Sequence, residues 1–353
     1  MSTQDQTWTV KAILDWCEGY LASKGDVNPR LSAQWLLGEA MGLSRIELYT
    51  NLDKPLSEEE RSTMRAWVQR RGAGEPLQLI CGTAPFRHMV LEVAPGVLIP
   101  RPETEVLVSE VLALFPAPKQ VSAYAFEDEV VTPEVDDGVK VVEVGEGAEA
   151  ESAAESGQSS NEVEAELDQP AEVAEEAPEP IHVIDLCTGS GCIACALATE
   201  HPNMEVLALD IASEALALAK RNAEAQGAGD RVTVVESDLL STVVADPANR
   251  GAFDVIVSNP PYIPSAVVDT LDAEVSDYEP RLALDGGQDG LDLFRRFIAD
   301  AHILLKPNGV LAVELFEDTL EEAAQIAESH GFANPRIVND LANNPRILLA
   351  NRT

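Results

Sequence analysis

Four consecutive residues, Asn259-Pro260-Pro261-Tyr262, follow an apolar run and have the types needed for chemistry on a planar amino nitrogen. The lone pair of such a nitrogen is delocalised, so a catalyst must hold the N–H hydrogens with acceptors and turn the lone pair toward an electrophile. The Asn259 side-chain oxygen and the Pro260 carbonyl can be these acceptors, because prolines remove backbone donors and restrict φ. Tyr262 adds a flat face for stacking. Asn259, Pro260 and Tyr262 are therefore candidate catalytic residues, and all four are candidates for substrate binding.

The same four residues also fit an ordinary turn at the end of a strand, because Asn-Pro and Pro-Pro are common in loops. The surrounding elements decide which interpretation is better. From Ile181 onward, strand-like and helical runs alternate, which predicts an α/β fold with a doubly wound, mostly parallel sheet and ligands at the carboxyl ends of its strands. The predicted strands are 182–186, 205–210, 232–236, 253–258 and 310–315, and the predicted helices are near 192–200, 213–226 and 290–305.

A glycine-containing loop follows the first of these strands and predicts a nucleotide-type cofactor site. Its glycines allow backbone N–H groups to approach a ligand at the start of a helix. Asp210 ends the second strand, where its carboxylate can accept both hydroxyls of a ribose. Ala194 completes a GxGxxG/A pattern, so a dinucleotide site remains open at this point. The candidate cofactor residues in the loop are Cys187, Thr188, Gly189, Ser190 and Gly191.

The third strand leads to Asp238 and Leu239, which can hold the edge and the face of an adenine, although Asp238 is equally suited to a turn or cap. The fourth strand then brings Asn259 beside this nucleoside site, where it is also a candidate cofactor contact. Methyl transfer from S-adenosyl-L-methionine is the simplest chemistry that joins the two sites, because in-line displacement at a sulfonium needs mainly positioning. No metal site is predicted, and neither HExxH nor GxSxG occurs.

The N-terminal part differs in pattern from the rest of the chain. Residues 1–75 have apolar positions at helical spacing and predict a small helical bundle, with Ser57 as an N-cap. Residues 76–100 predict a β-hairpin linker. Residues 101–353 form the predicted catalytic domain, which begins with a helix at Arg101-Pro102-Glu103-Thr104-Glu105.

Residues of about 117–180 interrupt that domain with a composition that predicts a disordered acidic insertion. Between residues 127 and 179 there are 19 acidic residues and one basic residue, Lys140, which is a balance of −18 out of a net charge of −37. An acidic docking tail is the alternative interpretation. A chain with this much negative charge repels the phosphate backbones of nucleic acids, so no direct nucleic-acid binding is expected.

The remaining composition predicts a cytoplasmic protein that does not enter a membrane. No stretch approaches the ~18 apolar residues that span a bilayer, and the first residues lack the pattern of a signal peptide. Five cysteines show no framework of paired spacing. Cys192 and Cys195 form a CxxC within an alanine-rich helical run, where buried thiols are expected rather than redox or metal chemistry.

With these motifs together, the chain resembles the protein-glutamine N5-methyltransferases that modify peptide chain release factors. The resemblance implies a class I S-adenosylmethionine-dependent methyltransferase fold with a helical N-terminal domain for substrate recognition, and a monomer. It implies methylation of the glutamine amide in the Gly-Gly-Gln motif of class 1 release factors, which are the expected partners. Residues 187–191, 210, 238 and 239 would hold the cofactor and residues 259–262 the glutamine. The segments that carry the resemblance are 74–78, 97–105, 187–191, 258–264 and 278–291.

Two positions depart from the family pattern, and two other functions remain open. Cys187 stands where a glycine is usual, and Leu315-Phe316-Glu317-Asp318-Thr319 replaces a segment that commonly begins Gly and then Gln. The chain's own Gly286-Gly287-Gln288 is interpreted as a loop before a helix, not as a substrate mimic. Because adenine N6 presents a similar NH₂ group, a DNA or RNA amino-methyltransferase is the alternative. A third interpretation is a non-enzymatic acidic interaction protein.

Overall fold

The computed structural model describes residues 7–116 and 179–353. The insertion predicted at about 117–180 therefore lies outside the described residues, apart from its edges. The N-terminal part consists of helices around a core of its own, to which Leu21, Leu36, Leu48 and Val68 contribute buried side chains. Its helices are α1 (Val10–Ser23), α2 (Pro29–Met41), α3 (Arg45–Thr50) and α4 (Glu58–Gly72).

Helix α4 begins where the sequence predicts it. The Ser57 hydroxyl accepts from the Glu60 N–H at 3.1 Å, and the Glu60 carboxylate accepts from the Ser57 N–H at 2.6 Å. This reciprocal pair is a capping box, which satisfies two of the backbone donors that a helix start leaves free. The predicted N-cap is confirmed.

The hairpin is shorter than the predicted linker of residues 76–100. Its strands are β1 (Thr83–Phe86) and β2 (Met89–Glu92), paired antiparallel. Residues Leu77–Cys81 form a short helix, α5, instead of a strand. Gly82 ends this helix with φ +79°, a left-handed conformation that glycine adopts without cost. The apolar residues before Gly82 are therefore packed as a helical turn.

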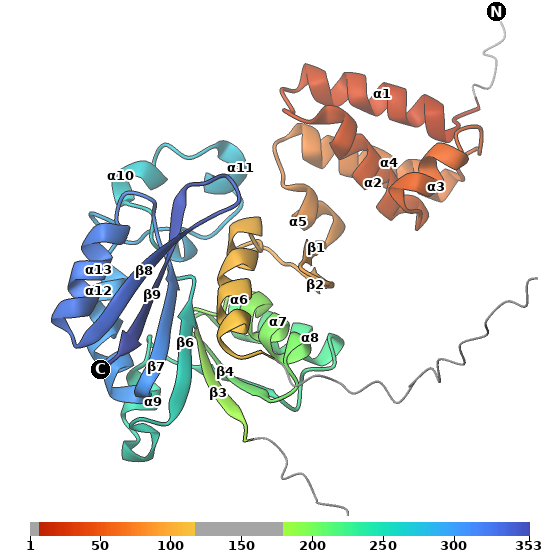
Figure 1. Ribbon diagram of the computed structural model, residues 1–353. Helices are drawn as coiled ribbons and strands as arrows, with labels where there is room; N and C mark the ends of the chain where they lie inside the picture. Colours follow the sequence, from red (N-terminus) through yellow and green to blue (C-terminus); the bar gives the residue numbers. More distant parts are fainter. Residues whose placement is uncertain (1–6, 117–178) are drawn as a thin grey trace, which may run out of the picture. The chain divides into compact units, whose positions relative to one another are not determined.

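Seven strands form a single sheet within the described ranges, in the order β5-β4-β3-β6-β7-β9-β8 (Figure 1). The first five in this order are parallel to one another, and β9 pairs antiparallel with both β7 and β8. The strands are β3 (Ile181–Leu186), β4 (Met204–Asp210), β5 (Val232–Glu236), β6 (Phe253–Ser258), β7 (Leu305–Glu314), β8 (Phe332–Asn339) and β9 (Pro345–Arg352).

Helices cover both faces of this sheet, which makes it doubly wound (Figure 1). One core joins α6 and α7 to side chains such as Val183, Val255 and Val257. A second core joins α12 and α13 to side chains such as Ile184 and Ile256, which alternate with the first set along the same strands. The covering helices are α6 (Pro102–Leu114), α7 (Cys192–Glu200), α8 (Ser213–Ala225), α12 (Asp292–Leu304) and α13 (Leu320–Ser329).

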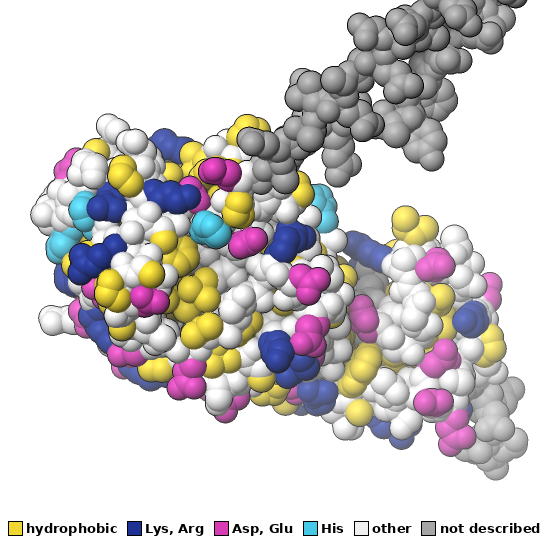
Figure 2. Space-filling model, turned by 90° about the horizontal axis from the view of Figure 1, so that it is seen from below, with side chains coloured by type: hydrophobic (Ala, Val, Ile, Leu, Met, Phe, Trp, Pro, Cys, Tyr) yellow, Lys and Arg dark blue, Asp and Glu magenta, His cyan; other side chains and the backbone are white. Residues whose placement is uncertain are grey.

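The connections after β5 and β6 contain short helical turns, several of them close to the carboxyl edge of the sheet. They are α9 (Ser241–Val244), η1 (Pro247–Asn249), α10 (Ser265–Val268), α11 (Ala273–Ser276) and η2 (Arg281–Ala283). No helix in the described parts of the chain has both the length and the apolar character required to cross a bilayer. On the face drawn in Figure 2, Lys and Arg side chains are interspersed with Asp and Glu side chains.

Candidate active site

The register of three neighbouring strands brings the predicted motifs to one edge of the sheet. Ser258 is paired with Leu186 of β3 on one side and with Val313 of β7 on the other. The residues that follow these three paired positions are Cys187 after Leu186, Asn259 after Ser258 and Glu314 after Val313. All three therefore lie at the same carboxyl edge of the sheet. Strand β3 pairs with both β4 and β6, so the chain reverses its direction of progress across the sheet here. Parallel α/β sheets bind ligands at such a switch point.

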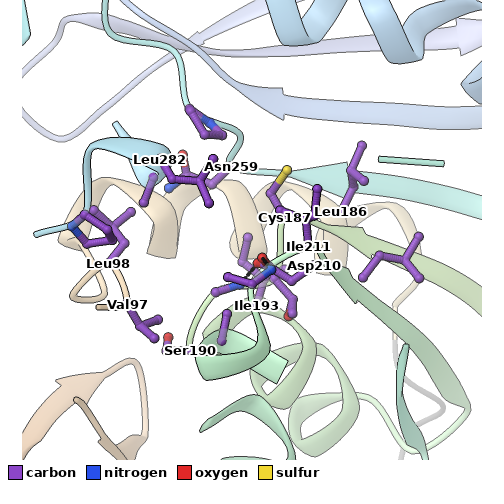
Figure 3. Close-up of a pocket in the computed structure, with 18 of the residues that line it drawn as sticks. Val97, Leu98, Leu186, Cys187, Ser190, Ile193, Asp210, Ile211, Asn259 and Leu282 are labelled. Atoms are coloured by element: carbon purple, nitrogen blue, oxygen red, sulfur yellow. Dashed lines mark hydrogen bonds between the residues drawn. The ribbon is translucent and has the colours of Figure 1, made fainter. Parts of the chain in front are cut away.

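A pocket opens at this edge and contains most of the predicted site residues (Figure 3). In this view Asn259 and Leu282 lie toward one end, and Ser190, Ile193 and Asp210 lie toward the other. Gly191, Pro260 and Tyr262 do not line the pocket. The predicted residues that do line it are Cys187, Thr188, Gly189, Ser190, Asp210, Asp238, Leu239, Asn259 and Pro261.

The loop after β3 is held against Asp210, the candidate ribose ligand. The Gly189 N–H donates to Asp210 Oδ2 at 2.9 Å, and the Ala212 N–H donates to Oδ1 at 3.0 Å. These bonds fix the direction of the carboxylate. Because each carboxylate oxygen has two acceptor positions, both oxygens retain one for a ligand.

Gly191 serves the site indirectly. It has φ +79°, and a Cβ placed on it would come within 3.0 Å of both Cα and Cβ of Ala219. A larger residue would therefore push α7 away from α8. The loop needs glycine here for close packing of two helices, rather than for contact with a ligand.

Asp185, in strand β3 just before the glycine-containing loop, holds this loop through hydrogen bonds. It is fully buried, and its Oδ2 accepts from the Thr188 hydroxyl at 2.6 Å and from the Ala194 N–H at 3.1 Å. Its Oδ1 has no partner in the described part of the chain. Loss of hydration raises the pKa of Asp185 to about 7, and the nearby charge of Asp210 adds to this.

Two non-glycine residues of the pocket have left-handed backbone conformations. Cys187 has φ +61° and Leu239 has φ +54°. Such conformations cost ~1–2 kcal/mol for residues with a side chain and are concentrated at functional sites. Cys187 directly follows β3, and Leu239 lies in the loop after β5. The strained conformations therefore lie where these loops turn toward the pocket. Burial, with the charges of Asp210 and Asp185, raises the pKa of the Cys187 thiol well above its ordinary value.

Asp238, the residue expected to hold the adenine, already has a hydrogen-bond partner. Both carboxylate oxygens of Asp238 accept from Nη2 of Arg296 at 2.9 Å, and both side chains are about half exposed. Arg296 lies on α12 and also lines the pocket. A ligand that uses Asp238 would share it with this guanidinium or displace the contact, and surface ion pairs of this kind are weak.

The side chains of Asn259 and Tyr262 are held by partners outside their own motif. Asn259 Nδ2 donates to Thr104 Oγ1 at 3.0 Å, and the Tyr262 hydroxyl donates to Glu314 Oε1 at 2.9 Å. Neither Asn259 Oδ1 nor the Pro260 carbonyl accepts a hydrogen bond from any described residue. Two adjacent acceptors are therefore available at the edge of the sheet.

Sequence reasoning assigned no role to several residues that form the walls of the pocket. Ile211 and Leu282 are apolar, line the pocket and are 52% and 62% exposed, which suits contact with a flat or apolar ligand. Ile211 follows Asp210 directly, and Leu282 falls within the segment 278–291, so both had a positional signal. Arg296 had none. The segment 96–101 also contributes to the wall, and the remaining wall residues are spread over several other elements.

Comparison with known proteins identifies the family. Residues 12–82 match a model described as the PrmC N-terminal domain, and residues 164–274 match the methyltransferase small domain. A release factor glutamine methyltransferase of Geobacter sulfurreducens is 38% identical over 95% of this chain and 93% of its own length. Its counterpart in Rhodopirellula baltica is 34% identical over 98% of this chain and 97% of its own length. The chain belongs to the release factor glutamine methyltransferase family.

Membership of this family confirms the prediction that was based on Asn259–Tyr262 and its flanking segments. The parallel sheet with helices on both faces confirms the predicted methyltransferase fold, and the helical N-terminal part fits the matched N-terminal family model. The dinucleotide enzyme that the glycine loop left open is not supported. The DNA or RNA amino-methyltransferase is not favoured either, because the relatives are named for a protein substrate.

Proposed function

We propose that this chain transfers a methyl group from S-adenosyl-L-methionine to the side-chain amide nitrogen of the glutamine in the Gly-Gly-Gln motif of class 1 peptide chain release factors. One observation carries the proposal. Asn259 lines the pocket, and its Oδ1 and the carbonyl of the adjacent Pro260 are acceptors without donors among the described residues. A glutamine amide has two N–H hydrogens that such a pair can bind.

The pocket suits an adenosyl cofactor. Asp210 presents a carboxylate with free acceptor positions for ribose hydroxyls, and Ile211 and Leu239 would supply apolar surface for a base. Asp238 and the backbone of residues 187–190 complete the proposed cofactor residues. When bound, S-adenosylmethionine supplies an electrophilic methyl group on a sulfonium.

The work of the protein is then to position the amide. A carboxamide nitrogen is a poor nucleophile because its lone pair is delocalised into the carbonyl. Acceptors on both N–H hydrogens fix the orientation of the NH₂ group and favour build-up of positive charge on nitrogen. Asn259 and Pro260 provide the acceptors, Pro261 lines the pocket and Tyr262 supports the motif. We assign recognition of the release factor to the N-terminal helical part.

The decisive experiment incubates the pure chain with isotope-labelled S-adenosylmethionine and a release factor, followed by mass mapping of the labelled residue. One label on the glutamine of the Gly-Gly-Gln motif is expected. The matched control is a release factor with this glutamine replaced by glutamate, which removes the amide and keeps the shape of the side chain. Label on nucleic acid, or on another residue of the release factor, would contradict the proposal.

A further inference from the structure

Three elements that are far apart in the sequence meet beside Asn259, and one of them contributes Thr104 to the wall of the pocket. Thr104 lies in the first turn of α6, Asn259 follows β6 and Glu314 ends β7. Thr104 is 1% exposed and Glu314 is fully buried. The Thr104 hydroxyl donates to Glu314 Oε2 at 2.7 Å and accepts from Asn259 Nδ2 at 3.0 Å. The three side chains thus form a continuous chain of hydrogen bonds.

The direction of this chain follows from how many hydrogens each group carries. Both carboxyl oxygens of Glu314 already accept, one from Thr104 and the other from Tyr262, and a hydroxyl has only one hydrogen to donate. Once Thr104 gives its hydrogen to Glu314, it can only accept from Asn259. The amide of Asn259 must then direct Nδ2 to Thr104 and turn Oδ1 to the opposite side. A rotation of the amide by 180° would place two acceptors against each other.

The other oxygen of Glu314 acts on the same motif. Its Oε1 accepts from the Tyr262 hydroxyl at 2.9 Å, so one carboxylate holds both Tyr262 and, through Thr104, Asn259. Buried carboxylates are costly and are retained where their hydrogen bonds fix a conformation. Glu314 has this position because β7 pairs with β6 in a register that places Val313 opposite Ser258.

We infer that Thr104 and Glu314 are positioning residues that set the amide orientation of Asn259, so that Asn259 Oδ1 is presented as an acceptor for the substrate NH₂. The inference rests on the proposed function of Asn259. It adds a requirement on residues that have no assigned contact with the reacting atoms. Without the Thr104 hydroxyl, the Asn259 amide can rotate, and the rotated amide would present its NH₂ group to the NH₂ group of the substrate.

The first test compares Thr104→Val with Thr104→Ser. Valine keeps the shape and removes the hydroxyl, whereas serine keeps the hydroxyl. We expect Thr104→Val to lower kcat by about 10- to 100-fold, in line with the cost of a misplaced reacting group, with a nearly unchanged dissociation constant for S-adenosylmethionine in calorimetry. Thr104→Ser should stay within about threefold of the wild type, since it retains both hydrogen bonds. A Thr104→Val enzyme with wild-type kcat would overturn the inference.

The second test asks whether Thr104 acts through Asn259. In an Asn259→Ala background, Thr104→Val should cause little further loss of kcat, because the side chain that it orients is already absent. If the two losses multiply, Thr104 acts independently and the inference is wrong.

The third test needs no release factor and separates this inference from the proposed function. In ¹⁵N NMR spectra, the side-chain NH₂ signals of Asn259 are assigned by their loss in Asn259→Ala. One of these hydrogens should exchange slowly in the wild type, become fast and shifted in Thr104→Val, and remain slow in Thr104→Ser. If the wild type methylates no release factor but gives this pattern, the proposed function fails and the positioning role stands. Signals unaffected by Thr104→Val, or fast exchange in the wild type, would refute the positioning role.

Discussion

The Ser258 hydroxyl donates a 2.7 Å hydrogen bond to the Leu186 carbonyl, at the last register pair of β6 and β3. Both residues are buried, so the bond is shielded from water. It fixes the two strand ends where the chain leaves the sheet, one into the glycine loop and the other into Asn259. The proposed cofactor site and the proposed amide site are thus held together by the strands themselves, rather than by their loops.

Replacing Asn259 by alanine tests the proposed amide site directly. Removal of one positioned polar group from a reacting centre lowers turnover by roughly 10²- to 10³-fold. We expect this loss in kcat, measured with labelled cofactor and a release factor. The affinity for S-adenosylmethionine should fall much less, because Asp210 and the glycine loop are untouched.

The matched control for that variant is Asn203→Ala, at a position that does not line the pocket. It should retain wild-type turnover. Near-normal turnover in Asn259→Ala, together with normal cofactor binding, would argue that the amide is held elsewhere.

Gly286 packs against the backbone of the proposed amide-binding motif, which gives the Gly286-Gly287-Gln288 loop a structural explanation. A Cβ on Gly286 would lie 2.6 Å from Tyr262 Cα and 2.8 Å from the Pro261 carbonyl oxygen. Both neighbours are backbone atoms and cannot rotate away. We expect Gly286→Ala to lower the free energy of unfolding by about 1–3 kcal/mol, the usual cost of overpacking, and to lower kcat by displacing the motif.

Gly19→Ala is the control for this substitution. Gly19 lies within α1 and has no atom within 4 Å of the added Cβ. Because alanine is the better helix former, this variant should gain up to about 1 kcal/mol of stability. Urea unfolding monitored by circular dichroism measures both variants. Equal stability changes in the two would show that the contact between Gly286 and Tyr262 is looser than its geometry indicates.

The parallel strands and the motif positions could be predicted because their signals are local. Strands β5 and β6 have the predicted bounds, and the Ser57 cap is where its sequence places it. The short helix α5 was missed because a short, mainly apolar run suits a strand or a helix equally. Strands β8 and β9 were also missed. Strand β8 is partly exposed and polar, whereas β9 has a buried apolar centre that no predicted strand covered; β9 depends on pairing with β7, and β8 on pairing with β9.

The contacts that orient the site could not be predicted from local pattern. Thr104 and Asn259 are 155 positions apart, and Tyr262 and Glu314 are 52 apart. Periodicity reports which face of an element is buried, but not which side chain of another element it meets. The contact between Arg296 and Asp238 escaped prediction for the same reason.

Cys187 provides a test of backbone strain at the position where it departs from the family pattern. Its φ of +61° favours glycine, whereas Cys195 lies inside helix α7, where alanine is favoured over glycine. We therefore expect opposite signs at the two positions. Cys187→Gly should be more stable than Cys187→Ala by about 1 kcal/mol, and Cys195→Gly less stable than Cys195→Ala by a similar amount. Within each pair of variants the cysteine thiol is absent from both, so the sign of the stability difference reports the backbone conformation at that position. Urea unfolding that gave glycine the lower stability at both positions would contradict the strained conformation.

Asp185 predicts a specific dependence of stability on pH. The folded chain has a pKa of about 7 at this carboxyl, against an ordinary value of 3.8. Between these values the unfolded chain is ionised while the folded chain retains the proton, so stability from this group falls as the pH rises from about 4 to 7. The fall is on the order of 4 kcal/mol over the window.

The variant Asp185→Asn has no carboxyl to titrate at this position, so it does not lose this stability as the pH rises. The free energy of unfolding of Asp185→Asn, minus that of the wild type, should therefore increase from about pH 4 to about pH 7 and stay level above it. Urea unfolding of both proteins at intervals from pH 4 to pH 8 measures this difference, in which the other titrating groups cancel. A difference that stays constant with pH would mean that Asp185 is ionised throughout, and that its unpartnered Oδ1 is hydrated in solution.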